Sequence, residues 1–170
     1  MDDLLVQSVL VQWRVNGKLH EIEAMPGMSL LDAVREQLGL RGTHMGCQTG
    51  HCGACTVMLD GRIVKSCLTQ AATLPRAEIV TIEGLKRADG TLNPVQQAFW
   101  DEAGFQCGYC APGMLLSAME LLAEHPEPTD AQIDTGLAGN LCRCTGYRSL
   151  VRAVKAAARK LQDTSGQTPG

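Results

Sequence analysis

Four closely spaced cysteines constrain this chain more than any other feature of its sequence. Cys47, Cys52 and Cys55 follow the spacing C-x4-C-x2-C, and Cys67 follows after a short predicted hairpin. This is the plant-type spacing of a [2Fe–2S] site, in which four thiolates hold the cluster. Glycines between these cysteines allow the backbone conformations that a loop needs to wrap closely around a cluster. The spacing therefore predicts an iron–sulfur site in preference to a zinc site or disulfides.

The composition limits the number of domains and the classes of function that the chain can have. The chain has 170 residues, enough for one domain of ordinary size or two small ones. Only 4% of the residues are aromatic, so a metal site is a plausible source of the stability that a thin core lacks. The net charge is −3 and no basic run is present, which argues against binding of nucleic acid.

The sequence predicts a cytoplasmic protein. Residues 1–5 are acidic where a secretory signal would be basic, and no apolar run approaches the ~20 residues of a membrane span. Clustered cysteines in a reducing cytosol bind metal more often than they form disulfides. Export of a folded complex on a partner's signal is the alternative.

Residues 9–84 are predicted to form a small α+β domain after a flexible leader over residues 1–8. Asn16-Gly17 and Asp60-Gly61 are strong hairpin signals between runs of strand-forming residues. Ser29 is a candidate N-cap for a helix that ends at Leu38, before Gly39. The predicted strands are residues 9–15, 18–24, 56–59, 62–65 and 78–83.

After a charged linker over residues 84–90, the hydrophobic period changes from that of strands to that of helices. Residues 91–161 are predicted to form an all-α domain, a four-helix bundle, followed by a flexible tail over residues 162–170. The helices are predicted to begin at Asn93-Pro94, at Pro112, at the capping box of Thr129 and Gln132, and near Leu150, whose stripe runs to Leu161.

A second group of cysteines lies in this helical half. Cys107, Cys110, Cys142 and Cys144 have the spacing C-x2-C-x31-C-x1-C, with each pair at a helix border. Packing of antiparallel helices would bring the two pairs together. A C-x-C pair is unusual for zinc, which prefers two to four intervening residues, so a second iron–sulfur site is predicted, with structural zinc as the alternative.

Four segments together resemble the iron–sulfur subunit of the molybdenum hydroxylases, the xanthine oxidase family. That family includes aldehyde oxidoreductases, carbon monoxide dehydrogenases and N-heterocycle dehydrogenases. The resemblance covers about residues 9–161. It is carried by residues 46–57, 65–67, 106–113 and 139–147.

The resemblance implies a ferredoxin-like β-grasp domain followed by a four-helix domain. It implies that Cys47, Cys52, Cys55 and Cys67 hold a distal cluster nearer the flavin, and that the other four cysteines hold a proximal cluster next to the molybdenum cofactor. It also implies that Gln106 and Cys144 contact the molybdopterin. Without the resemblance, Gln106 would be read as an amide that caps a helix-border carbonyl.

The resemblance further implies that the chain relays electrons from the molybdenum cofactor through its two clusters toward FAD or another acceptor. The sequence has no nucleophile–base pair, no phosphate-binding glycine fingerprint and no H-E-x-x-H motif, so no catalytic residue is predicted. The implied partners are a large molybdenum subunit and a medium FAD subunit, which some family members lack. A free-standing two-cluster carrier and a zinc-stapled interaction module remain alternatives.

Several residues have two readings. His44 and His51 invite a Rieske interpretation, but four cysteines already complete the site, so both are predicted to be loop histidines. Trp13 and Trp100 are each compatible with core or with a subunit interface. Arg143 either offsets the charge of a cluster or is solvated.

Overall fold

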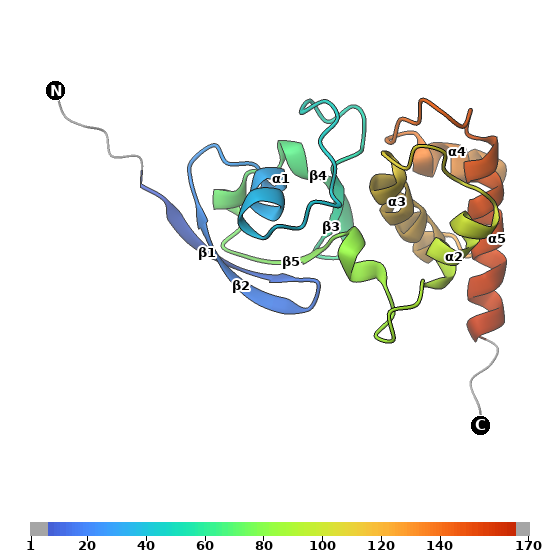
Figure 1. Ribbon diagram of the computed structural model, residues 1–170, viewed down its shortest axis with the longest axis horizontal. Coiled ribbons are helices and arrows are strands. Elements are labelled where there is room, and N and C mark those ends of the chain that lie inside the picture. Colours follow the sequence, from blue (N-terminus) through green and yellow to red (C-terminus); the bar gives the residue numbers. More distant parts are fainter. Residues whose placement is uncertain (1–6, 166–170) are drawn as a thin grey trace.

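The computed structural model describes residues 7–165, which divide into a sheet half and a helical half (Figure 1). The sequence predicts flexible ends over residues 1–8 and 162–170. Of these, residues 1–6 and 166–170 lie outside the described residues. The last helix continues to Ser165, past its predicted end at Leu161. Among the described residues, no helix has the length and apolar composition needed to cross a membrane.

The first half is built on one five-stranded sheet in the order β2-β1-β5-β3-β4. β1 and β5 pair in parallel, and the other neighbours are antiparallel. This confirms a mixed α+β fold. The strands are β1 (Val9–Val15), β2 (Lys18–Ala24), β3 (Thr56–Leu59), β4 (Arg62–Lys65) and β5 (Arg76–Val80).

Both predicted hairpins are confirmed, because their turn residues adopt the positive φ angles that a two-residue turn requires. Asn16 and Gly17 have φ angles of 50° and 80°, and Asp60 and Gly61 have φ angles of 48° and 83°. The strands consequently pair in the register that places Val15 opposite Lys18.

The alternation along β1 buries one face of the sheet. Val11, Trp13 and Val15 are buried, and the indole N–H of Trp13 donates a hydrogen bond of 2.8 Å to the carbonyl oxygen of Leu74. Trp13 is therefore a core residue and not an interface residue. Its cluster is completed by side chains of the short helix that crosses the sheet, such as Leu30.

The crossing helix is irregular. It begins as predicted at Ser29, whose hydroxyl accepts a hydrogen bond from the Asp32 N–H. After one turn, α1 (Leu30–Asp32), it widens into a π-helix, η1 (Ala33–Gln37). It ends at Leu38, before Gly39 with φ 68°.

The last strand differs from its prediction over residues 78–83. It begins at Arg76, where it pairs with β1, and ends at Val80. The side chain of Asn16 accepts from the Thr81 N–H and donates to the Thr81 hydroxyl, both over 2.9 Å. This contact draws the chain out of the sheet, and a 3-10 turn, η4 (Ile82–Leu85), follows.

Helices form the second half, and both sequence-predicted capping residues are confirmed. Asn93 with Gln96, and Thr129 with Gln132, form reciprocal capping boxes. The helices are α2 (Pro94–Asp101), α3 (Ala111–Glu124), α4 (Asp130–Leu137) and α5 (Arg148–Ser165).

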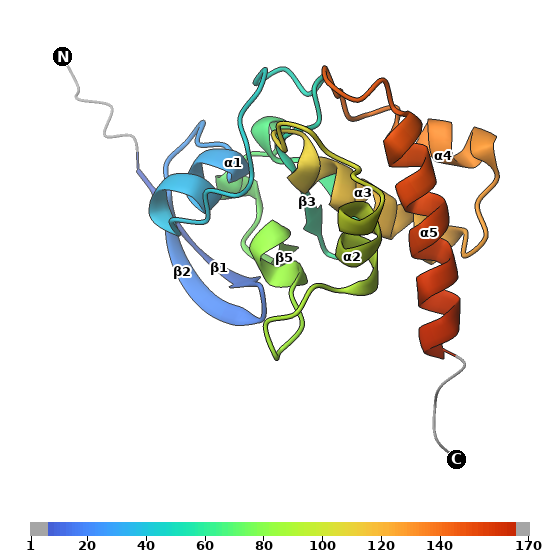
Figure 2. The same cartoon turned by 45° about the vertical axis from the view of Figure 1, so that its right-hand side comes forward.

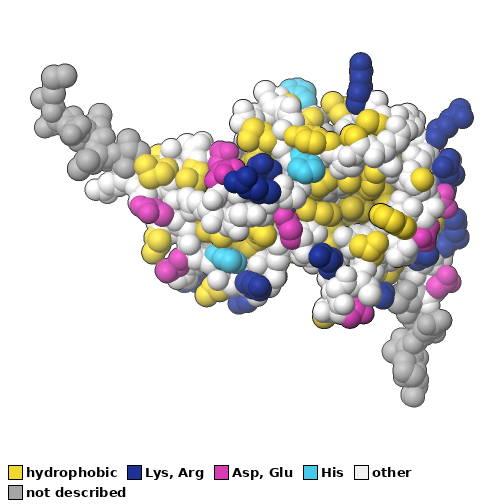
Figure 3. Space-filling model, in the orientation of Figure 1, with side chains coloured by type: hydrophobic (Ala, Val, Ile, Leu, Met, Phe, Trp, Pro, Cys, Tyr) yellow, Lys and Arg dark blue, Asp and Glu magenta, His cyan; other side chains and the backbone are white. Residues whose placement is uncertain are grey.

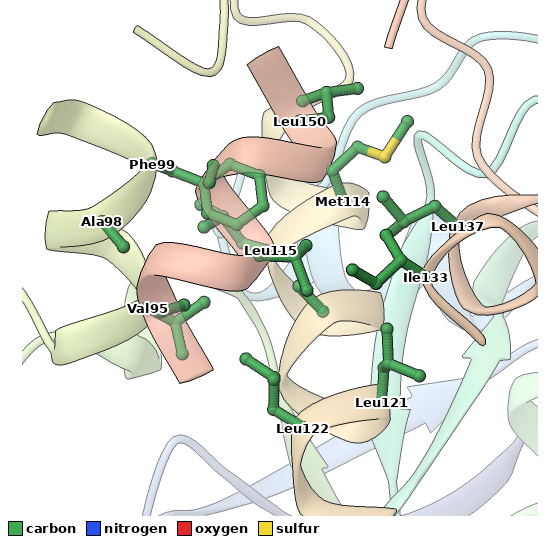
Figure 4. Close-up of a cluster of buried hydrophobic side chains, with 14 of the residues drawn as sticks. Val95, Ala98, Phe99, Met114, Leu115, Leu121, Leu122, Ile133, Leu137 and Leu150 are labelled. Carbon is green, nitrogen blue, oxygen red and sulfur yellow. The ribbon is translucent and has the colours of Figure 1, made fainter. Parts of the chain in front are cut away.

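One hydrophobic cluster joins these helices (Figure 4). Phe99 of α2, Met114 of α3, Ile133 of α4 and Leu150 of α5 are all at most 2% exposed. In Figure 2, α2 and α3 lie between the sheet and α5.

Helix α3 packs against the edge of the sheet that β3 and β4 form. Met58 and Ile63 contact the helical cluster. The Glu120 carboxylate accepts a hydrogen bond of 2.9 Å from the Ile63 N–H and pairs with Arg62 at 3.1 Å. The edge of the sheet is thus covered, and the two halves are held in contact.

Candidate metal centres

The cysteine-bearing loops of both halves lie at the same end of the molecule. In Figure 1, the loop before β3 and the loop between α4 and α5 are both at the top. We use "first thiol set" for Cys47, Cys52, Cys55 and Cys67, and "second thiol set" for Cys107, Cys110, Cys142 and Cys144. All eight are free thiols.

The thiols of the first set lie in two contacting pairs. The backbone N–H of Cys52 donates to the Cys47 sulfur at 3.4 Å, and the two side chains also interact. The Cys55 and Cys67 side chains lie close enough to interact with each other. Ser66 fixes this second pair, because its hydroxyl donates to the carbonyl oxygen of Cys55 at 2.6 Å.

The second set is also paired, as expected from the packing of antiparallel helices. The Cys144 and Cys107 sulfurs are 3.5 Å apart, although the residues are 37 positions apart in sequence. Cys110, at the N-cap of α3, contacts Cys142. Tyr147 holds the C-x-C turn, since its hydroxyl accepts from the Cys142 N–H at 2.9 Å.

The surroundings of the thiols give them different proton affinities. Hydrogen bonds, foremost from the Thr49 hydroxyl, lower the pKa of Cys47 to about 6. Burial raises the pKa of Cys67 to about 11 and that of Cys110 to about 12. A coordinated metal overrides such burial, because a thiol bound to a metal loses its proton.

The donor sets fit di-iron clusters. Two thiolates that share one tetrahedral metal at about 2.3 Å lie roughly 3.8 Å apart, close to the separation of Cys107 and Cys144. A [2Fe–2S] cluster with four cysteines has one such pair on each iron. Within residues 7–165, no three His, Cys, Asp or Glu side chains converge closely enough to hold a single metal ion.

A tight junction connects the two loops. The Leu141 N–H donates to the carbonyl oxygen of Cys52 at 2.8 Å. Beside it, the Asn140 amide is 2% exposed and donates to the Ser117 hydroxyl at 2.6 Å. The Thr56 hydroxyl lies 3.3 Å from the Asn140 side-chain oxygen. Thr56, Asn140 and Leu141 lie in the segments that carry the resemblance, but the sequence did not predict their contacts or the contact with Ser117.

A second bridge lies on the outer side of the loops. The Tyr109 hydroxyl donates to the carbonyl oxygen of Met45 at 2.7 Å, and the His44 ring nitrogen Nδ1 lies 2.8 Å from the carbonyl oxygen of Tyr109. The two rings also stack with centroids 4.6 Å apart. His44 is thus a loop residue with a structural contact, whereas the ring nitrogen Nδ1 of His51 lies 3.1 Å from the neighbouring Thr49 hydroxyl.

Gln106 is exposed beside Cys107 and lines a groove with Phe105 and Pro112. Its side-chain amide has no hydrogen-bond partner among residues 7–165, so it does not cap a carbonyl of the described chain. Arg143 is likewise exposed.

Two sequence models of cluster-binding domains match the chain. The model described as "2Fe-2S iron-sulfur cluster binding domain" matches residues 13–79, and the model described as "[2Fe-2S] binding domain" matches residues 81–155. The fold and the paired thiols therefore define a protein with two [2Fe–2S]-binding domains.

Relatives that match over most of their own length define the class of protein more closely. A probable xanthine dehydrogenase subunit of Bacillus subtilis is 44% identical over 86% of this chain and 84% of its own length. The nicotinate dehydrogenase small FeS subunit of Eubacterium barkeri is 40% identical over 91% and 98%, respectively. A chain of quinoline 2-oxidoreductase from Pseudomonas putida 86 superposes with a TM-score of 0.87 at 40% identity, covering 92% of this chain and 98% of that chain.

This chain belongs to the iron–sulfur subunits of the molybdenum hydroxylase family, and it is one part of an oxidoreductase.

Proposed function

We propose that this chain relays electrons from the molybdenum cofactor of a partner subunit, through two [2Fe–2S] clusters, toward FAD or another acceptor. The observation that carries the proposal is the 2.8 Å hydrogen bond from the Leu141 N–H to the carbonyl oxygen of Cys52. Cys52 belongs to the first thiol set, and Leu141 is bonded to Cys142 of the second. This one hydrogen bond therefore completes a short backbone path between the two sites. An electron relay requires such a path, whereas two separate structural metal sites do not.

Cys47, Cys52, Cys55 and Cys67 would hold the distal cluster, and the second thiol set would hold the proximal cluster. When bound, each cluster supplies a one-electron carrier. The chain's own residues position the sites: Tyr147 orients the second set through Cys142, and Ser66 orients the first through Cys55. We assign no catalytic residue to this chain.

The exposure of the second thiol set supports its placement next to the molybdenum cofactor. Two of its thiols, Cys107 and Cys144, are exposed, whereas all four thiols of the first set are half-buried or buried. The neighbouring Gln106 is exposed with its amide unpaired among the described residues. We therefore propose that Gln106 and Cys144 contact the molybdopterin, through the amide and the sulfur respectively.

Apolar side chains around the two sites support the presence of partner subunits. Large hydrophobic residues are exposed in or next to the cysteine loops, as on surfaces that a partner protein covers. They are Met45, Leu68, Tyr109 and Leu141. We propose a large molybdenum subunit over the second thiol set and a medium FAD subunit nearer the first.

A groove of about 560 Å³ lies beside Gln106, with Phe99 and Leu115 in its wall and Trp100 at its rim. Trp100 is 77% exposed, and hydrophobic side chains gather over the helical half in Figure 3. Because the groove adjoins the residue assigned to the molybdopterin, we propose that the large subunit fills it. Trp100 is then an interface residue.

We also propose the boundaries 9–84 and 91–161 for the two domains, with the second organised as a four-helix bundle. The single hydrophobic cluster that α2, α3, α4 and α5 share supports this division. A cytoplasmic location is proposed because all eight cysteines are free.

Metal analysis of the natively purified complex tests the proposal. Eight thiolates predict four irons per chain, in two clusters with distinct reduced-state electron paramagnetic resonance (EPR) signals. Zinc in place of iron would contradict the relay and support a zinc-stapled module. Gel filtration separates the remaining alternative, since a lone 18.2 kDa species carrying both clusters would be a free-standing carrier.

A further inference from the structure

Lys65 is a half-buried cation at the junction of the two halves. Its ammonium nitrogen donates a hydrogen bond of 2.9 Å to the Thr56 hydroxyl. The same nitrogen would lie 3.3 Å from a Cβ placed on Gly139. Within residues 7–165, no carboxylate lies within ion-pair distance of it. A cation in such a place normally has an acidic partner.

The fold fixes this ammonium in position. Lys65 and Thr56 are directly opposite each other in the pairing of β3 with β4. Thr56 is fully buried, and its hydroxyl lies 2.8 Å from the carbonyl oxygen of Gly53, within the first cysteine loop. The charge is therefore held by two strands and a loop, and does not move freely in solvent.

Lys65 lies beside the first thiol set, because its hydrogen-bond partner Thr56 directly follows Cys55 in the chain. Lys65 also leads directly into the turn that carries Cys67. The missing counterion of Lys65 is thus the first site itself, which carries net negative charge when four thiolates hold a [2Fe–2S] cluster.

The cation nearest to the second thiol set in sequence is Arg143. Arg143, between Cys142 and Cys144, is exposed to solvent, where its charge is screened. The two sites therefore differ in the fixed positive charge close to them.

We propose that Lys65 raises the redox midpoint potential of the first site relative to the second, and so biases the electron toward the first. This inference rests on the proposed relay. Transfer removes one electron from the second site and adds it to the first, with no bond made or broken and no proton moved. The first site gains one negative charge in this step. A fixed cation beside it stabilises that reduced form more than the oxidised form.

Redox titration of the full-length, iron-loaded chain, followed by EPR, tests the proposal. The two reduced signals are assigned with Cys52→Ser, which disrupts the first site only. Lys65→Met and Lys65→Gln remove the charge, and Lys65→Arg retains it as the matched control. Both neutral variants are expected to shift the first signal to a lower midpoint potential. The second signal should stay in place, and Lys65→Arg should titrate like the unchanged chain.

Unchanged midpoints in the iron-loaded neutral variants would overturn the role of Lys65 and leave the relay intact. An equal shift of both signals would also overturn it, because it would report a general change in structure. If the neutral variants lost iron while Lys65→Arg kept it, the cation would serve assembly and not potential, again against the proposal. Absence of iron from the unchanged chain would instead contradict the proposed function itself.

Discussion

Gly113, in the first turn of α3, lies against the carbonyl oxygen of Gly53 so closely that a Cβ on Gly113 would be 2.1 Å from that oxygen. This contact brings the helix that carries Cys110 directly onto the loop that carries Cys52. Both sites are therefore part of one packed junction, and the junction can be tested by substitution.

Gly113→Ala is expected to destabilise the fold by about 1–3 kcal/mol, because backbone has to move to admit the methyl group. Thermal unfolding measures the loss. Gly136→Ala, in α4, is the matched control: its Cβ would meet only the Leu121 side chain at 3.0 Å, and a helical alanine is favourable. Equal stability of the two variants would mean that the backbone at the Gly113–Gly53 contact moves to admit the methyl group without destabilising the fold.

Asn140→Ala is expected to cost about 1–3 kcal/mol, because it leaves the Ser117 and Thr56 hydroxyls short of a partner in a buried place. Chemical denaturation of the chain measures the change. The control is Thr135→Ala, which removes an exposed hydroxyl bonded only to the Ala131 carbonyl oxygen and should change stability by less than about 0.5 kcal/mol.

His44 and Tyr109 are expected to show a coupling energy of about 0.5–1 kcal/mol in a double-mutant cycle built from His44→Ala and Tyr109→Ala. The stacked rings and the contact of Nδ1 with the Tyr109 carbonyl oxygen connect loops from both halves. Tyr109→Phe isolates the hydrogen bond to Met45. Additive effects of the two alanine substitutions would show that the ring stacking carries no energy.

Trp100→Ala is expected to leave the isolated chain as stable as before, because the side chain is 77% exposed. Its affinity for the large subunit should fall at least about tenfold, as for an aromatic anchor at an interface. Titration of the large subunit with each variant, followed by gel filtration, gives the ratio. Leu19→Ala, at another exposed apolar residue on β2, is the control that should not change affinity; a loss of the same size there would argue against a localised interface.

Cys110→Ser and Cys52→Ser are expected to lower the iron content from four to two atoms per chain by disabling one site each. Cys110→Ser should block reoxidation of the molybdenum cofactor, whereas Cys52→Ser should block only the later step. Stopped-flow spectra of the complex distinguish the two. Full turnover of Cys52→Ser with the physiological acceptor would show that the order of the two sites is wrong.

The hairpins and helix starts were predictable because neighbouring residues decide them. Asn16-Gly17 and Asp60-Gly61 supply positive φ angles, and Asn93 and Thr129 supply caps, wherever the rest of the chain lies. The cysteine spacings likewise predicted two cluster-binding sites, and the two domain models agree with them.

Other features depended on contacts between distant residues, which a local pattern does not contain. Asn16 ends β5 because it contacts Thr81, 65 positions later. The sequence left both Trp13 and Trp100 compatible with a core or an interface position. Packing buries Trp13 and leaves Trp100 exposed.

The sequence by itself thus determined the element order, the turns and the two groups of cysteines, since each follows from covalent geometry and short-range spacing. Only the tertiary structure decided that Cys107 pairs with Cys144, that Leu141 meets Cys52, and that Lys65 is held without a carboxylate among the described residues. Each of these depends on how the sheet half and the helical half pack against each other, and that packing is a property of the whole chain.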